Sequence, residues 1–293
     1  MPLYELSETF TRRQAIESGV SDARLRRLRT VGTLRAVRRG VFDRTDVASS
    51  SKGQRHLAQA RAAMDRFTTG YAVSHLSAAA AHGLPLPLGD LGPVHLTAIH
   101  ATQRSRKSPG VVVHHADSSP TPVSETSGLV VTSVARTLAD CLRTRGPRVS
   151  VPLADAALHR GLLTIDELDD ELARQRRWRG RPRALESLLL VDWRRESWLE
   201  SYGCVRLSEW GLALPEPQVT VFDPWGEFVA RVDGAYQEDC TVVEFDGRSK
   251  YGLDGGSDAY GSSFFREKQR HNALVNVGLV VVRLELADLL QHV

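Results

Sequence analysis

Apolar and polar positions from residue 192 to the end change between the period of a strand and that of a helix. Three short apolar runs, bounded by turn residues, predict three successive strands. A longer stretch, with Ser262 or Ser263 as its N-cap and Gly278 at its end, predicts a helix, and the apolar run after it predicts a buried strand. The expected elements are a helix at 193–210, strands at 218–222, 228–234 and 240–246, a helix at 264–277 and a strand at 279–284.

The first 45 residues contain two short apolar stripes at helical spacing and then two runs at strand spacing. A Thr or Ser suited to an N-cap precedes each predicted helix, and a glycine follows it. The two runs surround Arg38-Arg39, as the strands of a hairpin surround its turn. Helix, turn, helix and β-wing are together the elements of a winged helix. The expected elements are helices at 12–18 and 22–31 and strands at 34–37 and 40–42.

The region between these ends mixes helical and strand patterns. An arginine-rich stretch at 174–183 ends it, as an exposed linker or as a contact to a nucleic-acid backbone. We therefore predict an α+β, multidomain protein. The expected elements are helices at 54–67, 74–83, 134–142 and 151–159 and strands at 94–98 and 111–114. The expected domains are a winged-helix DNA-binding domain at 1–53, an α/β region at 54–190 and a C-terminal αβββαβ domain at 191–293.

Composition indicates a globular protein without membrane segments. Hydrophobic residues make up 42% and charged residues 25% of the 293, which are ordinary proportions for a soluble protein. No apolar run approaches the roughly 18 residues of a membrane span, and the start of the chain has no secretory signal. We therefore expect a cytoplasmic protein with no membrane partner.

Cysteines and histidines form no recognisable metal-site pattern. The three cysteines are far apart, which argues against a zinc site and against a disulfide framework. The ten histidines are scattered, and His114-His115 has no partner at metal-ligand spacing. His75 and His82 are seven residues apart, so they share a helix face, and we interpret them as structural.

Arginine carries nearly all of the positive charge. The chain has only four lysines, and this skew favours forked contacts to phosphate, although a GC-rich genome produces the same bias. Between Phe10 and Asp46 there are ten arginines and only four acidic residues. Such an excess is typical of phosphate neutralisation, whereas a merely solvated face mixes both signs. The expected DNA contacts are Arg24, Arg26, Arg27, Arg29, Arg38 and Arg39.

Carboxylates cluster at the ends of two predicted strands near the C-terminus. Glu244 and Asp246 are two apart in one strand, so they share a face, and a hairpin places Asp233 beside them. Clustered carboxylates repel one another unless a cation neutralises them, and Mg²⁺ or Mn²⁺ is the expected oxygen-ligated cation. The alternative, a pair of Asp-Gly turns, accounts for Asp233 and Asp246 but not for Glu244 at the end of an apolar strand.

Four short motifs of the C-terminal domain occur in the order of a known fold. They are Arg231-Val232-Asp233, Val243-Glu244-Phe245-Asp246-Gly247, Glu267-Lys268-Gln269-Arg270 and Gly278-Leu279-Val280-Val281-Val282-Arg283. With them, residues 191–293 resemble the restriction-endonuclease-like PD-(D/E)XK fold, in the branch related to very-short-patch mismatch-repair endonucleases. The resemblance implies that Asp233 and Glu244 ligate a divalent metal, with Glu200 as a further carboxylate.

The chain departs from this family at one position. The lysine expected two residues after the glutamate is replaced by Asp246. Lys268 and Lys250 are the candidates for the missing catalytic cation. At about 100° per residue, Lys268 falls on the apolar face of its helix, which is expected against the sheet. There its ammonium group either reaches the carboxylates or extends to solvent.

The first 190 residues resemble the AbiEi-like antitoxins of type IV toxin–antitoxin systems. This resemblance is carried by Phe10-Thr11-Arg12, Arg38-Arg39-Gly40-Val41-Phe42 and Ser74-His75-Leu76-Ser77-Ala78-Ala79. It implies a winged helix followed by an α/β region, with a cognate toxin as a partner.

Two functions are compatible with these patterns. The first is a DNA-binding protein whose C-terminal domain is a Mg²⁺-dependent endonuclease that hydrolyses phosphodiester bonds. The alternative is a non-catalytic, antitoxin-like transcriptional regulator that uses the nuclease fold as a scaffold. Metal-dependent cleavage of plasmid DNA would favour the enzyme, and a neighbouring nucleotidyltransferase toxin gene would favour the regulator.

Overall fold

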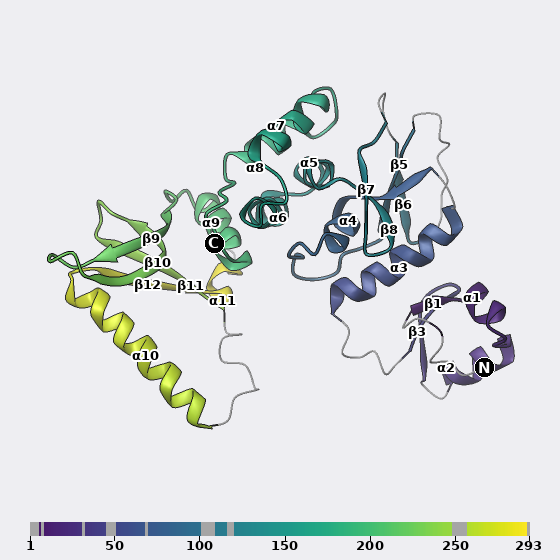
Figure 1. Cartoon of the computed structure of the whole chain (residues 1–293), viewed down its shortest axis with the longest axis horizontal. Helices are drawn as coiled ribbons and strands as arrows, with labels where there is room; N and C mark the ends of the chain where they lie inside the picture. Colours follow the sequence, from purple (N-terminus) through teal and green to yellow (C-terminus); the bar gives the residue numbers. More distant parts are fainter. Residues whose placement is uncertain are drawn as a thin grey trace. The chain divides into compact units, whose positions relative to one another are not determined.

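Three β-sheets, with the helices that pack on them, form the part of the chain that the computed structural model describes (Figure 1). The described residues are 6, 9–30, 33–44, 51–67, 70–100, 109–115, 120–247 and 257–291. The chain divides into two compact units, residues 1–144 with 165–178 and residues 145–164 with 179–293. The predicted α+β, multidomain class is confirmed. Within the described segments, no helix combines the length and apolar character that a membrane crossing needs.

The N-terminal sheet, in the first unit, has three antiparallel strands in the order β1-β3-β2. Its elements are β1 (Thr9–Thr11), α1 (Arg12–Glu17), α2 (Asp22–Thr30), β2 (Leu34–Arg38) and β3 (Val41–Arg44). A capping box between Thr11 and Gln14 fixes the start of α1, and Phe10, Leu25 and Phe42 are buried together in the core. The two predicted helices and the hairpin are confirmed, whereas the short strand β1 is not predicted from the sequence.

The second sheet, also in the first unit, has five strands in the order β6-β5-β4-β8-β7. Its strands are β4 (Tyr71–Val73), β5 (Val94–Ala98), β6 (Val111–His114), β7 (Val123–Thr126) and β8 (Leu129–Thr132). The helices of this part are α3 (Lys52–Phe67), α4 (His75–Ala81), α5 (Val134–Thr144) and α7 (Ile165–Arg174). β4 is parallel to β8 and antiparallel to β5, and β5 is parallel to β6. Val73, Leu96 and Val131 lie fully buried in its core.

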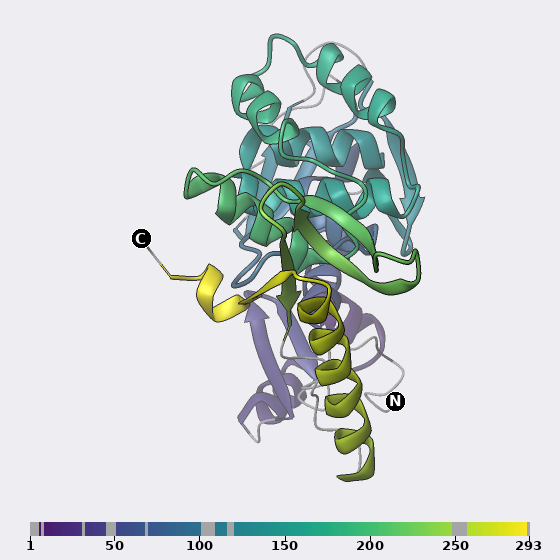
Figure 2. The same cartoon turned by 90° about the vertical axis from the view of Figure 1, so that its left-hand side faces the viewer.

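The third sheet lies in the second unit and has the order β12-β11-β10-β9. Its strands are β9 (Glu216–Phe222), β10 (Phe228–Tyr236), β11 (Thr241–Asp246) and β12 (Val280–Glu285). The helices of this unit are α6 (Pro147–His159), α8 (Arg181–Leu188), α9 (Trp198–Glu209), α10 (Ser257–Asn276) and α11 (Leu286–Leu289). β11 and β12 are parallel, so α10 is the crossover between them. α10 contacts β10 and β12, and Figure 2 shows that the helix also extends beyond the strands of the sheet. The predicted order of helix, three strands, helix and strand is confirmed.

The two faces of the third sheet are covered by different helices. Val243 and Phe245 of β11 pack in the cluster that contains α9 residues. Val242, one position away, packs with Leu274 of α10. Neighbouring residues of a strand point to opposite faces, so Glu244 belongs to the α10 face.

The expectation that the last strand is buried is wrong. β12 is an edge strand, and Val280 and Val282 are 57% and 38% exposed. An apolar run corresponds to a strand buried on both faces only where other elements cover both faces of the sheet. Here β11 is the one hydrogen-bonded neighbour of β12 in the described sheet.

We predict that Gly203→Ala destabilises the second unit. A Cβ atom at residue 203 would lie 2.2 Å from Cε1 of Phe245, which is buried between α9 and β11. Overpacking costs about 1–3 kcal/mol, more than the roughly 1 kcal/mol that alanine gains over glycine in a helix. Urea titration should therefore show a free energy of unfolding lower by about 1–2 kcal/mol. Ser208→Ala on the same helix is the control, and equal stability of the two variants would contradict the close packing.

Candidate functional site

Strands β10 and β11 separate where the predicted carboxylates begin. Their pairing extends from Gly234 opposite Val243 to the turn. At the next position, Oδ2 of Asp233 accepts a hydrogen bond from the backbone N–H of Phe245 at 2.9 Å. Nη2 of Arg270 donates to the carbonyl of Arg231 at 2.8 Å. Side chains thus replace backbone ladder bonds at this end of the sheet.

Glu244 is buried at this point and lies between two arginines. Its side chain is 9% exposed, with Nη2 of Arg270 at 2.7 Å from Oε1 and Nη2 of Arg283 at 3.7 Å from Oε2. The short contact to Arg270 does not have hydrogen-bond geometry, so among the described residues Oε1 has no hydrogen-bond donor. A second nitrogen of Arg283 pairs with Glu267 at 2.7 Å. Glu244 is therefore neutralised in charge but incompletely hydrogen-bonded.

Asp246 also has a buried carboxylate oxygen, Oδ1, that lacks a hydrogen-bond donor in the described part of the chain. In the parallel pairing of β11 with β12, it lies opposite a second acid, Glu285. Buried polar atoms without a partner are uncommon, and an acceptor oxygen in this state is suited to a cation.

Lys268, one of the two cations expected at this site, lies elsewhere. Lys268 is exposed, and the described residues include no ion pair between it and an acid. Arg270, two positions further along α10, contacts Glu244 instead. Two residues correspond to about 200° around a helix, so these side chains point in nearly opposite directions. The expectation that Lys268 lies on the sheet-facing side is wrong, and Lys250 lies outside the described residues.

Glu200 joins this region at the side of β9. The side chain is buried, and its Oε2 accepts hydrogen bonds from Nε2 of Gln218 at 2.7 Å and from the N–H of Glu196 at 3.1 Å. Gln218 lies between the registered pairs of β9 and β10, next to Asp233.

The four predicted metal ligands are Asp233, Glu244, Asp246 and Glu200. In the described segments, no three of them have oxygens within 4.8 Å of one another. Of these four acids, Glu244 and Asp246 are the two that have a buried oxygen without a donor among the described residues. These two, with Asp233 beside them, are therefore the acids that fit an oxygen-ligated dication such as Mg²⁺.

Helix α2 presents exposed arginines in the first unit. Arg24, Arg26, Arg27 and Arg29 are all exposed. The acid in its first turn, Asp22, accepts two hydrogen bonds from Arg12 of α1, one of them from Nε at 2.7 Å, and these lower the pKa of Asp22. Asp22 is thus already paired, and α2 keeps a net positive surface. Arg39 is also exposed, whereas the side chain of Arg38 lies outside the described part.

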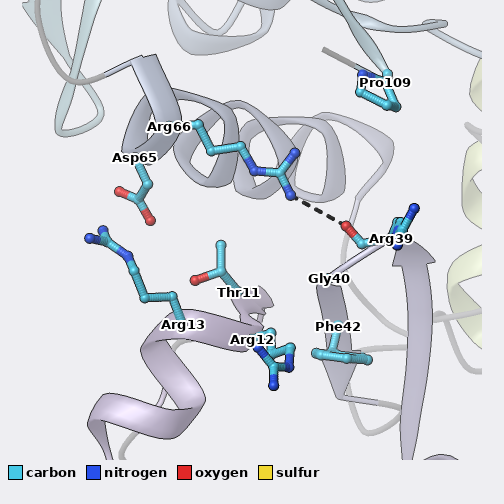
Figure 3. A pocket seen from close by; sticks show the side chains of 10 residues that line it. Thr11, Arg12, Arg13, Arg39, Gly40, Phe42, Asp65, Arg66 and Pro109 are labelled. Carbon is cyan, nitrogen blue, oxygen red and sulfur yellow. Dashed lines mark hydrogen bonds between the residues drawn. The ribbon is translucent and has the colours of Figure 1, made fainter.

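A pocket of about 880 Å³ lies beside this surface (Figure 3). Four arginines and one acid line it: Arg12, Arg13, Arg39, Arg66 and Asp65. Arg66 donates a hydrogen bond to the carbonyl of Arg39 at 3.3 Å, so α3 holds the turn between β2 and β3. Figure 3 shows the guanidinium of Arg13 and the carboxylate of Asp65 turned toward each other. The remaining positive charge suits the pocket to an anion such as phosphate.

The structure also groups three histidines that sequence spacing does not connect. One nitrogen of each of His75, His95 and His114 lies within 4.8 Å of the others. Burial, followed by the charges of the other two histidines, holds the pKa of His75 well below its ordinary value. His82, which the sequence interpretation pairs with His75, instead bonds the carbonyl of Thr132 at 2.8 Å.

Comparison with known proteins gives a family but no activity. No model of a known protein family matches the chain. The chain is 30% identical over 231 residues to two uncharacterized proteins of Mycobacterium tuberculosis, MT2308 of strain CDC 1551 / Oshkosh and Rv2248 of strain ATCC 25618 / H37Rv. Each match covers 78% of this chain and 79% of the relative. The chain therefore belongs to the same family as these mycobacterial proteins.

We predict that Asp246→Asn stabilises the protein in EDTA. Asp246 and Glu285 lie opposite each other on adjacent strands, and like charges in such positions destabilise a sheet. Asparagine removes the repulsion, so the free energy of unfolding should rise by about 0.2–1 kcal/mol. Urea titration measures this change, with Asp239→Asn in the exposed turn as the control. A lower free energy of unfolding for Asp246→Asn would contradict electrostatic repulsion between Asp246 and Glu285.

Proposed function

We propose that this chain is a DNA-binding protein whose C-terminal domain hydrolyses phosphodiester bonds with a divalent metal, Mg²⁺ or Mn²⁺. The observation that carries this proposal is the pair of buried carboxylate oxygens without donors, on Glu244 and Asp246, where β10 and β11 separate. The αβββαβ order and the resemblance to the PD-(D/E)XK fold support the same conclusion.

Asp233, Glu244 and Asp246 would hold the metal in this reaction. The bound ion supplies an activated water and neutralises negative charge on the phosphate. Arg270 takes the place of the family lysine, because its guanidinium is already fixed beside Glu244 by the carbonyl of Arg231. From there it can stabilise the charge that develops on the phosphate oxygens.

The first unit would supply DNA affinity. We interpret β1, α1, α2 and the β2–β3 hairpin as a winged helix, with α2 as the recognition helix and the hairpin as the wing. The exposed arginines of α2 and the arginine-lined pocket beside them fit phosphates of the backbone. Such contacts determine position and affinity but not sequence.

A non-catalytic regulator is the second candidate, and one observation favours it. Two arginines already neutralise Glu244, which is the arrangement of a folded ion pair as much as of a metal site. The AbiEi-like resemblance of the first 190 residues agrees with this role and with a toxin as partner. Incubation with supercoiled plasmid, with and without Mg²⁺ or Mn²⁺, separates the two candidates, because the regulator would bind the plasmid without cutting it.

We predict that α2 makes the phosphate contacts. Replacing Arg27 and Arg29 with alanine should reduce the slope of log K against log salt by about 2, because each lost phosphate contact contributes about 0.9. The matched control is the replacement of Arg176 and Arg177, two exposed arginines of the alternative surface. Fluorescence anisotropy with a labelled duplex measures both slopes. If the slope falls for the control and stays unchanged for the α2 variant, the phosphate contacts lie in the 174–183 stretch and not on α2.

We predict that the acids and Arg270 are needed for cleavage. Asp233→Asn and Glu244→Gln should abolish it, since each removes a charge that holds the metal, while the asparagine oxygen can still accept from Phe245. Arg270→Met should slow cleavage by about 10²–10³-fold, on the scale of one lost electrostatic stabiliser. Lys268→Met, on the exposed side of the same helix, is the matched control and should cleave at the wild-type rate. A wild-type cleavage rate for Arg270→Met would show that Arg270 does not stabilise the transition state.

A further inference from the structure

Three histidines from separate parts of the chain meet in the first unit. His75 begins α4, His95 lies in β5, and His114 ends β6. A nitrogen atom from each lies within 4.8 Å of the other two. His75 is 3% exposed and His95 9%, while His114 is only partly buried, so the cluster is buried on one side and reachable on the other.

The sheet register explains why they meet. In the parallel pair of β5 and β6, His95 is opposite Val112 and Thr97 is opposite His114. Residues two apart share a face, so His95 and His114 lie on the same side of the sheet. His75 reaches them because α4 starts directly beyond β4, and the N–H of Ser74 bonds the carbonyl of His95 at 2.9 Å.

The nitrogen positions are close to those of metal ligands. Nδ1 of His95 and Nε2 of His114 are 2.9 Å apart. Two nitrogens at about 2.05 Å from a tetrahedral ion would be about 3.3 Å apart, so a small side-chain movement admits an ion between them. The ring of His75 stacks on that of His114 with centroids at 3.9 Å, and one of its nitrogens lies within 4.8 Å of a nitrogen of each of the other two histidines.

The backbone at His75 is held in an unfavourable conformation. Its φ of 53° is left-handed, which non-glycine residues seldom adopt. Such strain persists where surrounding bonds enforce it, and it concentrates at functional sites. Here Oγ of Ser74 lies 3.0 Å from Nδ1 of His75, and Oγ of Ser77 accepts a hydrogen bond from the backbone N–H of His95 at 3.0 Å. These serines fix the two histidines that are most deeply buried.

The surrounding charges would tolerate a dication. Oδ2 of the buried Asp140 lies 4.0 Å from Nδ1 of His75, so a negative charge stands near the cluster without bonding the ring. Arg136 and Arg143 pair with Asp140, and Arg136 also lies 3.8 Å from Glu171. Arg174 also pairs with Glu171, at 3.1 Å, so each arginine of this network has an acid as its partner.

We propose that His75, His95 and His114 bind one divalent first-row transition-metal ion of the Zn²⁺ class. Three imidazole nitrogens suit such ions, whereas Mg²⁺ prefers oxygen. Three protein ligands leave a fourth position for water or a substrate atom, as in catalytic zinc sites. This site is independent of the proposed nuclease chemistry of the C-terminal domain.

The test uses Co²⁺, whose d–d absorption reports its ligands without any assay of activity. The full chain is titrated in a Cys240→Ser background, because Cys240 is an exposed free thiol that could bind metal itself. One equivalent of Co²⁺ should give a tetrahedral spectrum that Zn²⁺ displaces. His114→Gln should weaken binding by at least about 100-fold, since even an outer-shell partner contributes about 10–100-fold.

The neighbouring His115→Gln is the matched control, because His115 is exposed and outside the cluster. It should bind Co²⁺ like the background protein. His95→Gln serves as a second ligand variant, with the melting temperature measured to confirm folding. No Co²⁺ or Zn²⁺ binding by the background protein, or equal binding by His114→Gln and His115→Gln, would overturn the proposal and leave a hydrogen-bonded histidine cluster. Unchanged binding in Asp233→Asn would separate this site from the C-terminal acids.

Discussion

Each of the two units is stabilised internally by a buried carboxylate that is bonded to arginine. Asp140 is fully buried and accepts hydrogen bonds at both oxygens, from Arg136 at 2.8 Å and from Arg143 at 2.5 Å. In the second unit, Asp155 accepts one bond from an arginine and one from a backbone N–H. A buried ionised acid is costly unless all of its oxygens have partners, so these bonds determine where the helices can lie. Glu244 departs from this rule, since its Oε1 has no donor among the described residues.

Part of the arginine content therefore has a structural role. Arg136 and Arg143 both place their guanidinium groups over the ring of Trp178, at 4.4 and 4.7 Å from its centroid. A lysine offers neither the planar fork nor the same stacking. A count of arginines is thus weak evidence for nucleic-acid binding. The exposed arginines of α2 are better evidence, because the acid of that helix is already paired with Arg12.

The sequence predicts most helices and strands whose hydrophobic pattern is long enough to show a period. It does not predict features that depend on which strands pair with each other. β1, β4, β7 and β8 have three or four residues each and are not predicted, whereas β6 is as short but begins with the apolar run Val111-Val112-Val113. β12 has the composition of a central strand but lies at an edge, which only its pairing reveals. The predicted acids do lie at one end of the third sheet, whereas helix phase places Arg270 rather than Lys268 beside Glu244. The histidine cluster could not be predicted, because it depends on the register of β5 with β6.

Asp246 stands where the PD-(D/E)XK fold that residues 191–293 resemble has a lysine, so the proposed site needs another source of positive charge. Here the charge comes from α10 and β12, through Arg270 and Arg283, and not from β11. A guanidinium stays charged at every pH of interest, so it can stabilise a phosphate but cannot act as a base. Proton transfer must therefore fall to water or to a carboxylate. The same two arginines compete with a metal for Glu244. Asp246 has a buried Oδ1 without a donor in the described chain, so metal binding would depend most on this acid.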